Sequence, residues 1–182
     1  THVQRNMEGQ ALGHEANFKI AQTSYFKGDF RWALTQLNVL KRSTTQLIAN
    51  DALFLNLRIQ DNILDDSTQT SLKDFAAADL LVLQDNTDQA IVSLKDILVK
   101  HEGKSIIDDT HFKLGELYYE LNDYEQAAEH WEVVVQEHGY DLLADSALYK
   151  LGLLYEEKLN QPEKAMTYYE KIIFDYSDSI YF

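Results

Sequence analysis

The sequence reads Lys-Leu-Gly-Glu-Leu-Tyr-Tyr-Glu at residues 113–120 and Lys-Leu-Gly-Leu-Leu-Tyr-Glu-Glu at residues 150–157, which is 37 residues later. A second pair of similar stretches follows the first. Residues 124–131 align with residues 162–169 after one inserted residue. Self-similarity at a period between about 20 and 50 residues is typical of proteins built from stacked structural repeats.

Apolar residues recur at helical spacing through both copies. In residues 124–135 they occupy positions i, i+3, i+4, i+7, i+10 and i+11, which form one face of a helix. Seven Gly and one Pro are fewer than a protein rich in turns or strands needs. The sequence therefore predicts an all-α chain of nine helices, near residues 10–27, 29–43, 47–64, 69–84, 87–101, 107–121, 123–138, 143–159 and 162–176.

Short polar joints separate the predicted helices, and several end with a residue suited to capping the next helix. The side-chain oxygens of Asp29, Asn86 and Asp123 are predicted to accept otherwise unpaired amide N–H groups. Pro162 falls at the start of the last helix, where its missing N–H has no cost.

Together these features resemble the tetratricopeptide repeat, a helix–turn–helix unit. The resemblance rests on Leu-Gly-x-x-Tyr in the first helix, followed in the second by Ala and an aromatic residue four positions later. It implies an all-α solenoid, a right-handed superhelix in which helix pairs stack on one another. Gly115 and Gly152 are expected to let two helices approach closely, and Trp131 and Tyr155 to fill the core between them.

Weaker copies of the repeat lie upstream, with Ala21 and Ala78 at the glycine position. The gap between these two alanines exceeds the later spacing by 20 residues, about one helix and a turn. We therefore predict one domain over 1–182, a fragment of a longer protein, with an extra helix near 47–64. Its repeats are expected near 11–45, 68–104, 107–142 and 143–178. Alternatively, 47–64 pairs with 69–84, and 87–101 is the odd helix.

The composition argues against several functional classes. The absence of Cys excludes disulfides and thiolate metal sites, and a net charge of −14 argues against nucleic acid as a partner. No apolar run approaches the ~20 residues that span a membrane. The histidines do not form a metal-binding motif: His130 and His138 stand eight residues apart, and His111 is predicted to pack between helices. We therefore expect no enzyme activity, metal or cofactor.

The negative charge is concentrated in the second half of the chain. Residues 1–91 carry a net −3, whereas residues 92–182 carry −11. The resemblance implies that the first helix of each pair lines a concave surface, and aromatic residues among carboxylates would make this groove amphipathic. The predicted groove residues are Phe18, Gln22, Tyr25, Phe26, Phe75, Asp79, Phe112, Glu116, Tyr119, Glu120, Tyr149, Leu153 and Glu156.

These observations predict a non-catalytic scaffold whose groove binds a protein or peptide with basic and apolar side chains. The alternative is a structural segment of a larger solenoid. Its apolar C-terminal end, residues 172–174 and 180–182, would then stack on further repeats or self-associate. A looser likeness to bacterial cell-envelope repeat proteins favours the periplasm or cell envelope over the cytoplasm.

Overall fold

The computed structural model describes residues 11–40, 46–137, 143–176, 179 and 181. Every regular element in these residues is a helix, which confirms the predicted all-α class. The elements are α2 (Ala11–Phe26), α3 (Phe30–Leu40), α4 (Gln46–Asp65), α5 (Thr70–Leu83), α6 (Thr87–Lys100), α7 (Ile106–Glu120), α8 (Tyr124–Glu137), α9 (Ala144–Leu153), the π-helix η1 (Leu154–Lys158) and α10 (Pro162–Asp175).

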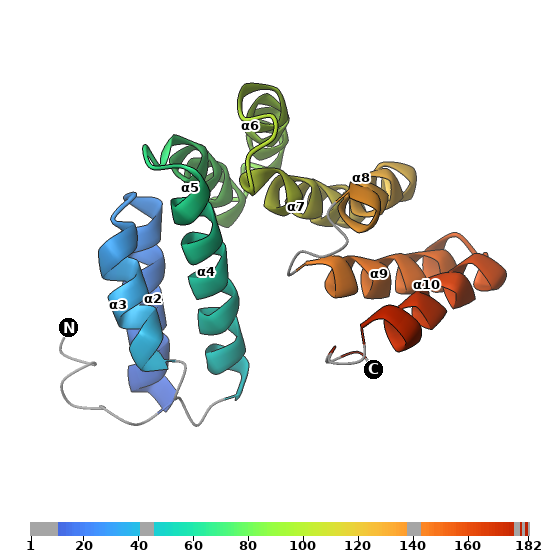
Figure 1. Cartoon of the computed structure of the whole chain (residues 1–182), viewed down its shortest axis with the longest axis horizontal. Coiled ribbons are helices and arrows are strands. Elements are labelled where there is room, and N and C mark those ends of the chain that lie inside the picture. Colours follow the sequence, from blue (N-terminus) through green and yellow to red (C-terminus); the bar gives the residue numbers. More distant parts are fainter. Residues whose placement is uncertain (1–10, 41–45, 138–142, 177–178, 180, 182) are drawn as a thin grey trace. The chain divides into compact units, whose positions relative to one another are not determined.

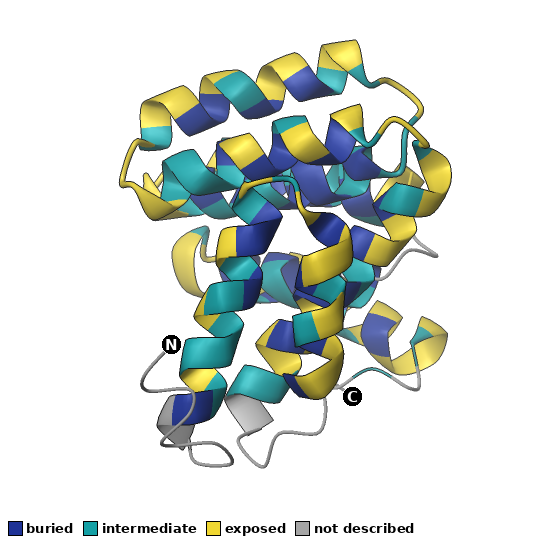
Figure 2. Cartoon of the chain, turned by 90° about the vertical axis from the view of Figure 1, so that its left-hand side faces the viewer, coloured by how far each residue is buried: buried dark blue, intermediate teal, exposed yellow. Residues whose placement is uncertain are grey.

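The described residues belong to two compact units. The first draws on Thr1–Ser93 and Gly103–Ile106, and the second on Leu94–Glu102 and Ile107–Phe182. In both units the helices carry a buried stripe on one side and exposed residues on the other (Figure 2). This is the pattern expected when each amphipathic helix buries one face against its neighbours.

In the first unit, α2 and α3 form a helical hairpin, and α4 packs on α3 while also contacting α2 and α5 (Figure 1). The predicted extra helix near 47–64 is therefore an integral part of this unit. Ala52 and Ile59 of α4 are completely buried, as are Ala33 and Leu37 of α3. The division of this part of the chain into repeats stays a prediction.

The turns that end α2, α5, α7 and η1 each contain one residue with left-handed backbone: Gly28, Asp85, Asn122 and Asn160 (φ 74°, 60°, 62° and 52°). Glycine adopts this conformation without strain, and Asn and Asp tolerate it better than other residues. The predicted cap residues follow three of these turns. Of these, Asp123 is confirmed as an N-cap, because its Oδ1 accepts the N–H of Gln126 at 3.3 Å.

In the second unit, α8 packs on α9, and α9 pairs with α10 (Figure 1). The predicted close helix approaches are confirmed: a Cβ at Gly115 would lie closer than 3.0 Å to the indole of Trp131, and one at Gly152 equally close to the ring of Tyr169. Trp131 is 2% exposed, and its Nε1 donates to the carbonyl of Phe112 at 3.2 Å. Trp131 and Tyr155 are buried, as predicted.

The helix predicted over 143–159 changes from an α-helix to a π-helix within its length. It begins as α9 and continues as the π-helix η1, whose end is marked by a hydrogen bond from the Leu159 N–H to the Leu154 carbonyl at 3.0 Å. This bond spans five residues instead of the four of an α-helix. The prediction was therefore right in extent but missed the π-helix.

Candidate functional site

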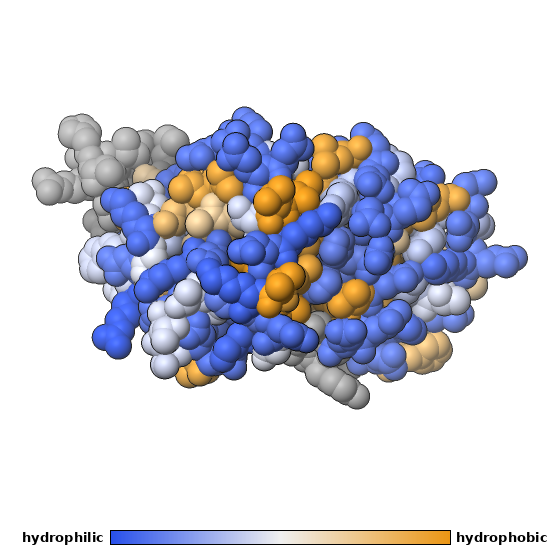
Figure 3. Space-filling model, turned by 90° about the horizontal axis from the view of Figure 1, so that it is seen from above, coloured by the Kyte–Doolittle hydropathy of each residue, from blue (hydrophilic) through white to orange (hydrophobic). Residues whose placement is uncertain are grey.

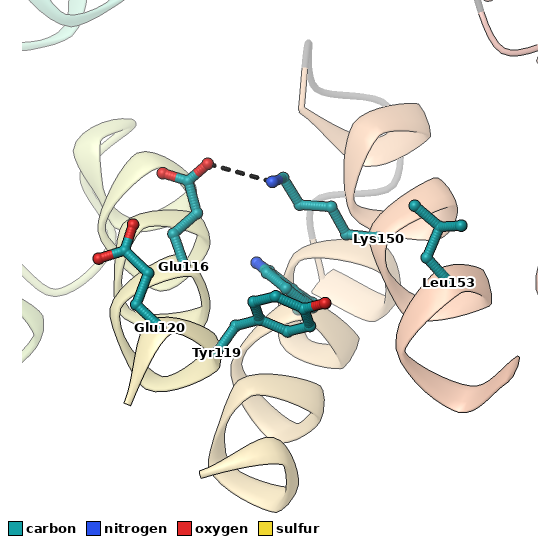
Figure 4. Close-up of a pocket in the computed structure, with 6 residues that line it drawn as sticks. Glu116, Tyr119, Glu120, Lys150 and Leu153 are labelled. Atoms are coloured by element: carbon teal, nitrogen blue, oxygen red, sulfur yellow. Dashed lines mark ion pairs between the residues drawn. The ribbon is translucent and has the colours of Figure 1, made fainter. Parts of the chain in front are cut away.

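The second unit contains a cavity of about 250 Å³, which we take as the candidate site. Its lining comes from three helices: Glu116, Tyr119 and Glu120 of α7, Trp131 of α8, and Lys150 and Leu153 of α9. In Figure 4 the two carboxylates lie on one side, Lys150 and Leu153 on the other, and Tyr119 between them. The cavity thus combines apolar walls with charged edges.

Glu116 is held by two lysines. Its Oε2 lies 2.7 Å from Lys113 Nζ, one turn earlier on α7, and its Oε1 lies 3.3 Å from Lys150 Nζ on α9 (Figure 4). Burial acts to raise the pKa of Glu116, but the positive charges and hydrogen bonds of Lys113 and Lys150 outweigh it, so the pKa is lowered. Glu116 therefore stays ionised and ties α7 to α9 beside the cavity.

Contacts between lysines and aromatic rings also shape the electrostatics. Lys150 Nζ lies 5.5 Å from the ring centroids of both Phe112 and Trp131, within the range of a cation–π contact. Lys158 Nζ lies 5.8 Å from the ring of Tyr119. Glu120, by contrast, is exposed at the edge of the cavity. Among the lining carboxylates, Glu120 is the more accessible to a partner.

The cavity brings together four of the predicted groove residues: Glu116, Tyr119, Glu120 and Leu153. Two others of the second unit lie nearby on α9 and η1 with partners of their own. The ring of Tyr149 stacks on Tyr181, with centroids 4.3 Å apart, and Glu156 accepts a hydrogen bond from the Tyr169 hydroxyl at 2.8 Å. Phe112 is buried, so its prediction as a partner contact was wrong.

The predicted groove residues of the first unit do not line the cavity, and two of them are buried. Phe18, Gln22 and Phe26 are partly exposed on α2. Tyr25 and Phe75 are buried in the core, so the prediction that they face a partner was wrong. Aromatic side chains at these positions stabilise the unit itself.

The predicted groove positions of the first unit differ from those of the second because the extra helix α4 brings Arg58 against α5. Arg58 Nη1 lies 3.2 Å from Asp79 Oδ2, which also accepts the Tyr25 hydroxyl at 3.2 Å. The Arg58 guanidinium carbon lies 5.0 Å from the ring centroid of Phe75. The predicted groove positions Phe75 and Asp79 of α5 therefore contact the extra helix, and Tyr25 of α2 is joined to it through Asp79.

Sequence reasoning missed two of the cavity-lining residues. Trp131 was assigned to the core alone, although it also forms part of the cavity wall. Lys150 was not singled out, although a signal existed: Lys113 and Lys150 occupy the same position in the two copied stretches. Both of these aligned lysines contact Glu116.

A second polar cluster lies between α8, η1 and α10. Glu132 Oε1 accepts hydrogen bonds from the hydroxyls of Tyr155 at 3.0 Å and Tyr168 at 2.8 Å, and from Lys164 Nζ at 3.0 Å. Burial acts to raise the pKa of Glu132, but hydrogen bonds from Tyr168, Lys164 and Tyr155 outweigh it, so the pKa is lowered. The cluster fastens the last two hairpins to each other.

The structure also pairs two histidines that lie on different helices. Nδ1 of His111 on α7 lies 2.9 Å from Nδ1 of His130 on α8, and Tyr118 stacks on the His130 ring. Burial and the nearby charges of His111 and Lys95 lower the pKa of His130 to about 4. His111 thus packs between helices as predicted, but its pairing with His130 was missed. His138 lies outside the described residues.

Within the part of the chain that the structure describes, no three His, Asp or Glu side chains are grouped so that they could bind a metal ion. The same residues include no helix with the length and apolarity needed to cross a membrane. The face drawn in Figure 3 is mostly hydrophilic, with separate apolar patches.

Comparison with known proteins bears on the second unit. A search of curated proteins found no match. A family model described as "Tetratricopeptide repeat" matches residues 109–139 and 146–179. These matches cover α7 with α8 and α9 with α10, which are the two hairpins that build the cavity. Over these residues the second half of the chain is similar to two tetratricopeptide repeats, in the places where the sequence predicted its last two.

Proposed function

We propose that the chain is a non-catalytic scaffold whose cavity on the second unit binds a segment of a protein partner. Tetratricopeptide repeats generally mediate protein–protein interaction. The observation that carries the proposal is a cavity with an apolar wall, lined by Tyr119, Trp131 and Leu153, beside the exposed carboxylate of Glu120. Such a surface suits a side chain with an apolar body and a basic end.

The charges suggest which partner segment fits. Glu116 is already bonded to Lys113 and Lys150, so a basic group of the partner would approach Glu120. Its aliphatic portion, or a neighbouring apolar side chain, would enter the cavity beside Leu153. The net charge of −11 over residues 92–182 would steer a basic segment toward this unit. We therefore propose a partner segment that carries Lys or Arg together with apolar residues.

A charge reversal at Glu120 tests the proposal. The probe is a short fluorescein-labelled peptide of alternating Lys and Leu, and binding is measured by fluorescence anisotropy at low salt. Glu120→Lys should weaken binding about tenfold, which corresponds to roughly 1.4 kcal/mol. The matched control is Glu163→Lys, because Glu163 is also exposed but lies at the start of α10 and does not line the cavity.

Equal losses in the two variants would show that the peptide responds only to overall charge, and would contradict the cavity assignment. A peptide of alternating Glu and Leu should bind neither the parent chain nor the control variant. Glu116→Lys is a poorer test, since it also breaks the ion pairs that join α7 to α9. Once the peptide result is in hand, the parent chain and Glu120→Lys can be compared as baits to identify the natural partner.

The cell-envelope location stays a prediction. It would be checked by fractionating cells of the source organism and probing each fraction with an antibody against this chain. Recovery in the cytosolic fraction alone would contradict it.

A further inference from the structure

Within the second unit, contacts between a helix and the hairpin that follows it recur at corresponding positions. In the first instance, Lys95 Nζ of α6 lies 5.4 Å from the ring of Tyr118 on α7, and Tyr118 stacks on His130 of α8, with centroids 5.6 Å apart and planes 7° apart. A helix thus presents one charged residue to a stacked pair of rings in the hairpin that follows it.

The second instance uses the residues that the repeat alignment predicts. Glu132, which stands 37 residues after Lys95, faces Tyr155 and Tyr168. These two rings stack with centroids 5.6 Å apart and planes 12° apart, and both hydroxyls donate to Glu132. Lys164 adds a third donor. Each of the two charged residues, Lys95 and Glu132, thus contacts the stacked pair of rings in the hairpin that follows it.

The same register continues onto α10. The alignment of α8 with α10 places Glu170 at the position of Glu132, Met166 at that of Ala128 and Ile173 at that of Val135. Ala128 is 5% exposed, whereas Met166 is 60% exposed and Ile173 51%. Glu170 and the neighbouring Phe174 are exposed as well. On α10, the side chain at the position of Glu132 and the apolar side chains beside it are therefore exposed.

We propose that this face of α10, formed by Met166, Glu170, Ile173 and Phe174, docks a helical hairpin of a partner protein that presents tyrosine hydroxyls and an amine to Glu170. Glu170 occupies on α10 the position that Glu132 occupies on α8, where Glu132 accepts hydrogen bonds from donors of this kind. An exposed carboxylate flanked by apolar side chains complements them.

A second copy of the chain is a poorer occupant. If two α10 faces packed on each other, Glu170 and Glu163, which lies two turns earlier on the same side of the helix, would be brought near their counterparts. Like charges at an interface repel, and neither glutamate would gain a donor. The α10 face therefore calls for a partner with hydroxyl and ammonium groups.

The test supplies a hairpin with the required donors. A second copy of residues 144–176 is appended at the C-terminal end of the full chain, and Met166→Cys is introduced at the original position. The chain has no other Cys, so a thiol reagent reports only on this face. In the extended chain the labelling rate of the introduced thiol should fall about tenfold or more, because labelling then requires local opening.

Two matched variants separate docking from mere tethering. Glu170→Ala should restore much of the labelling rate in the extended chain and lower its melting temperature, but change neither in the chain without the extra hairpin. Phe in place of the appended copies of Tyr155 and Tyr168 keeps the ring shapes and removes the hydroxyl donors. This variant should restore labelling to a similar degree.

Equal labelling of the introduced thiol with and without the extra hairpin would overturn the proposal. Protection of the thiol that is unchanged by both Glu170→Ala and the Tyr-to-Phe replacements would overturn it as well. If the chain without the extra hairpin dimerises and protects the thiol, a second copy is the occupant and the proposed partner is wrong. Glu120→Lys should leave all these labelling rates unchanged, so this test and that of the cavity fail independently.

Discussion

Replacing Gly115 by Ala adds one methyl group where α7 crosses Trp131. The new Cβ would lie closer than 3.0 Å to atoms of the indole ring. Overpacking of this kind typically costs about 1–3 kcal/mol. The ring has little room to move, since Trp131 is buried and its N–H is bonded to the Phe112 carbonyl. We therefore place the cost at the upper end of that range.

Alanine also favours the helix by about 1 kcal/mol relative to glycine, which offsets part of this cost. The expected net loss in the free energy of unfolding is about 2 kcal/mol. For a chain of this length, that loss corresponds to a decrease in melting temperature of about 4–8 °C. Urea unfolding, followed by circular dichroism and by tryptophan fluorescence, measures the change.

Gly152→Ala is the matched control. A Cβ there would overlap Tyr169 to a similar extent, but that ring is partly exposed and its hydroxyl is bonded to the exposed Glu156. Because Tyr169 can shift toward solvent, this variant should lose at least about 1 kcal/mol less than Gly115→Ala. If Gly115→Ala is as stable as the parent chain, or loses less than Gly152→Ala, the packing argument is wrong.

Two other predictions concern the same unit. Asp123→Ala removes the N-cap of α8 and should lower the free energy of unfolding by about 1 kcal/mol, whereas Asp123→Ser should retain most of it; urea unfolding of the two variants checks this. His130 has a folded pKa of about 4 against about 6.5 unfolded. The unfolded chain therefore binds the proton more readily, so stability should fall as the pH drops from 6.5 to 4. In His130→Phe this loss of stability should be smaller than in the parent chain, as measured by the urea midpoint at each pH. An equal decrease of the midpoint in both chains would contradict the lowered pKa of His130.

The helices could be predicted because each depends on local sequence. The helical spacing of apolar residues, the turn residue Asn122 and the cap residue Asp123 all lie within a few positions of one another. The helix boundaries there agree with the predicted ones to within about one residue. The close helix approach at Gly115 was also predictable, because a glycine inside a helix needs a packing reason.

The groove could be predicted only in part, because it depends on how distant segments pack. The alignment treated α2 and α5 like α7 and α9, but Arg58 of α4 reaches Phe75 and Asp79. Nothing local to Phe75 indicates that a helix near residue 58 will cover it. The pairing of His111 with His130 was missed for the same reason, since the two rings come from different helices.

The π-helix η1 accommodates the one residue by which residues 150–169 are longer than the aligned residues 113–131. The extra residue falls between Glu157, which aligns with Glu120, and Asn160, which aligns with Asn122. In an α-helix an added residue would turn everything after it by about 100°. A wider turn at Leu154–Lys158 takes up that residue before the hairpin bends, so that Tyr168 still reaches Glu132. An insertion in a repeat can thus be absorbed inside a helix while the spacing of the contacts beyond it is preserved.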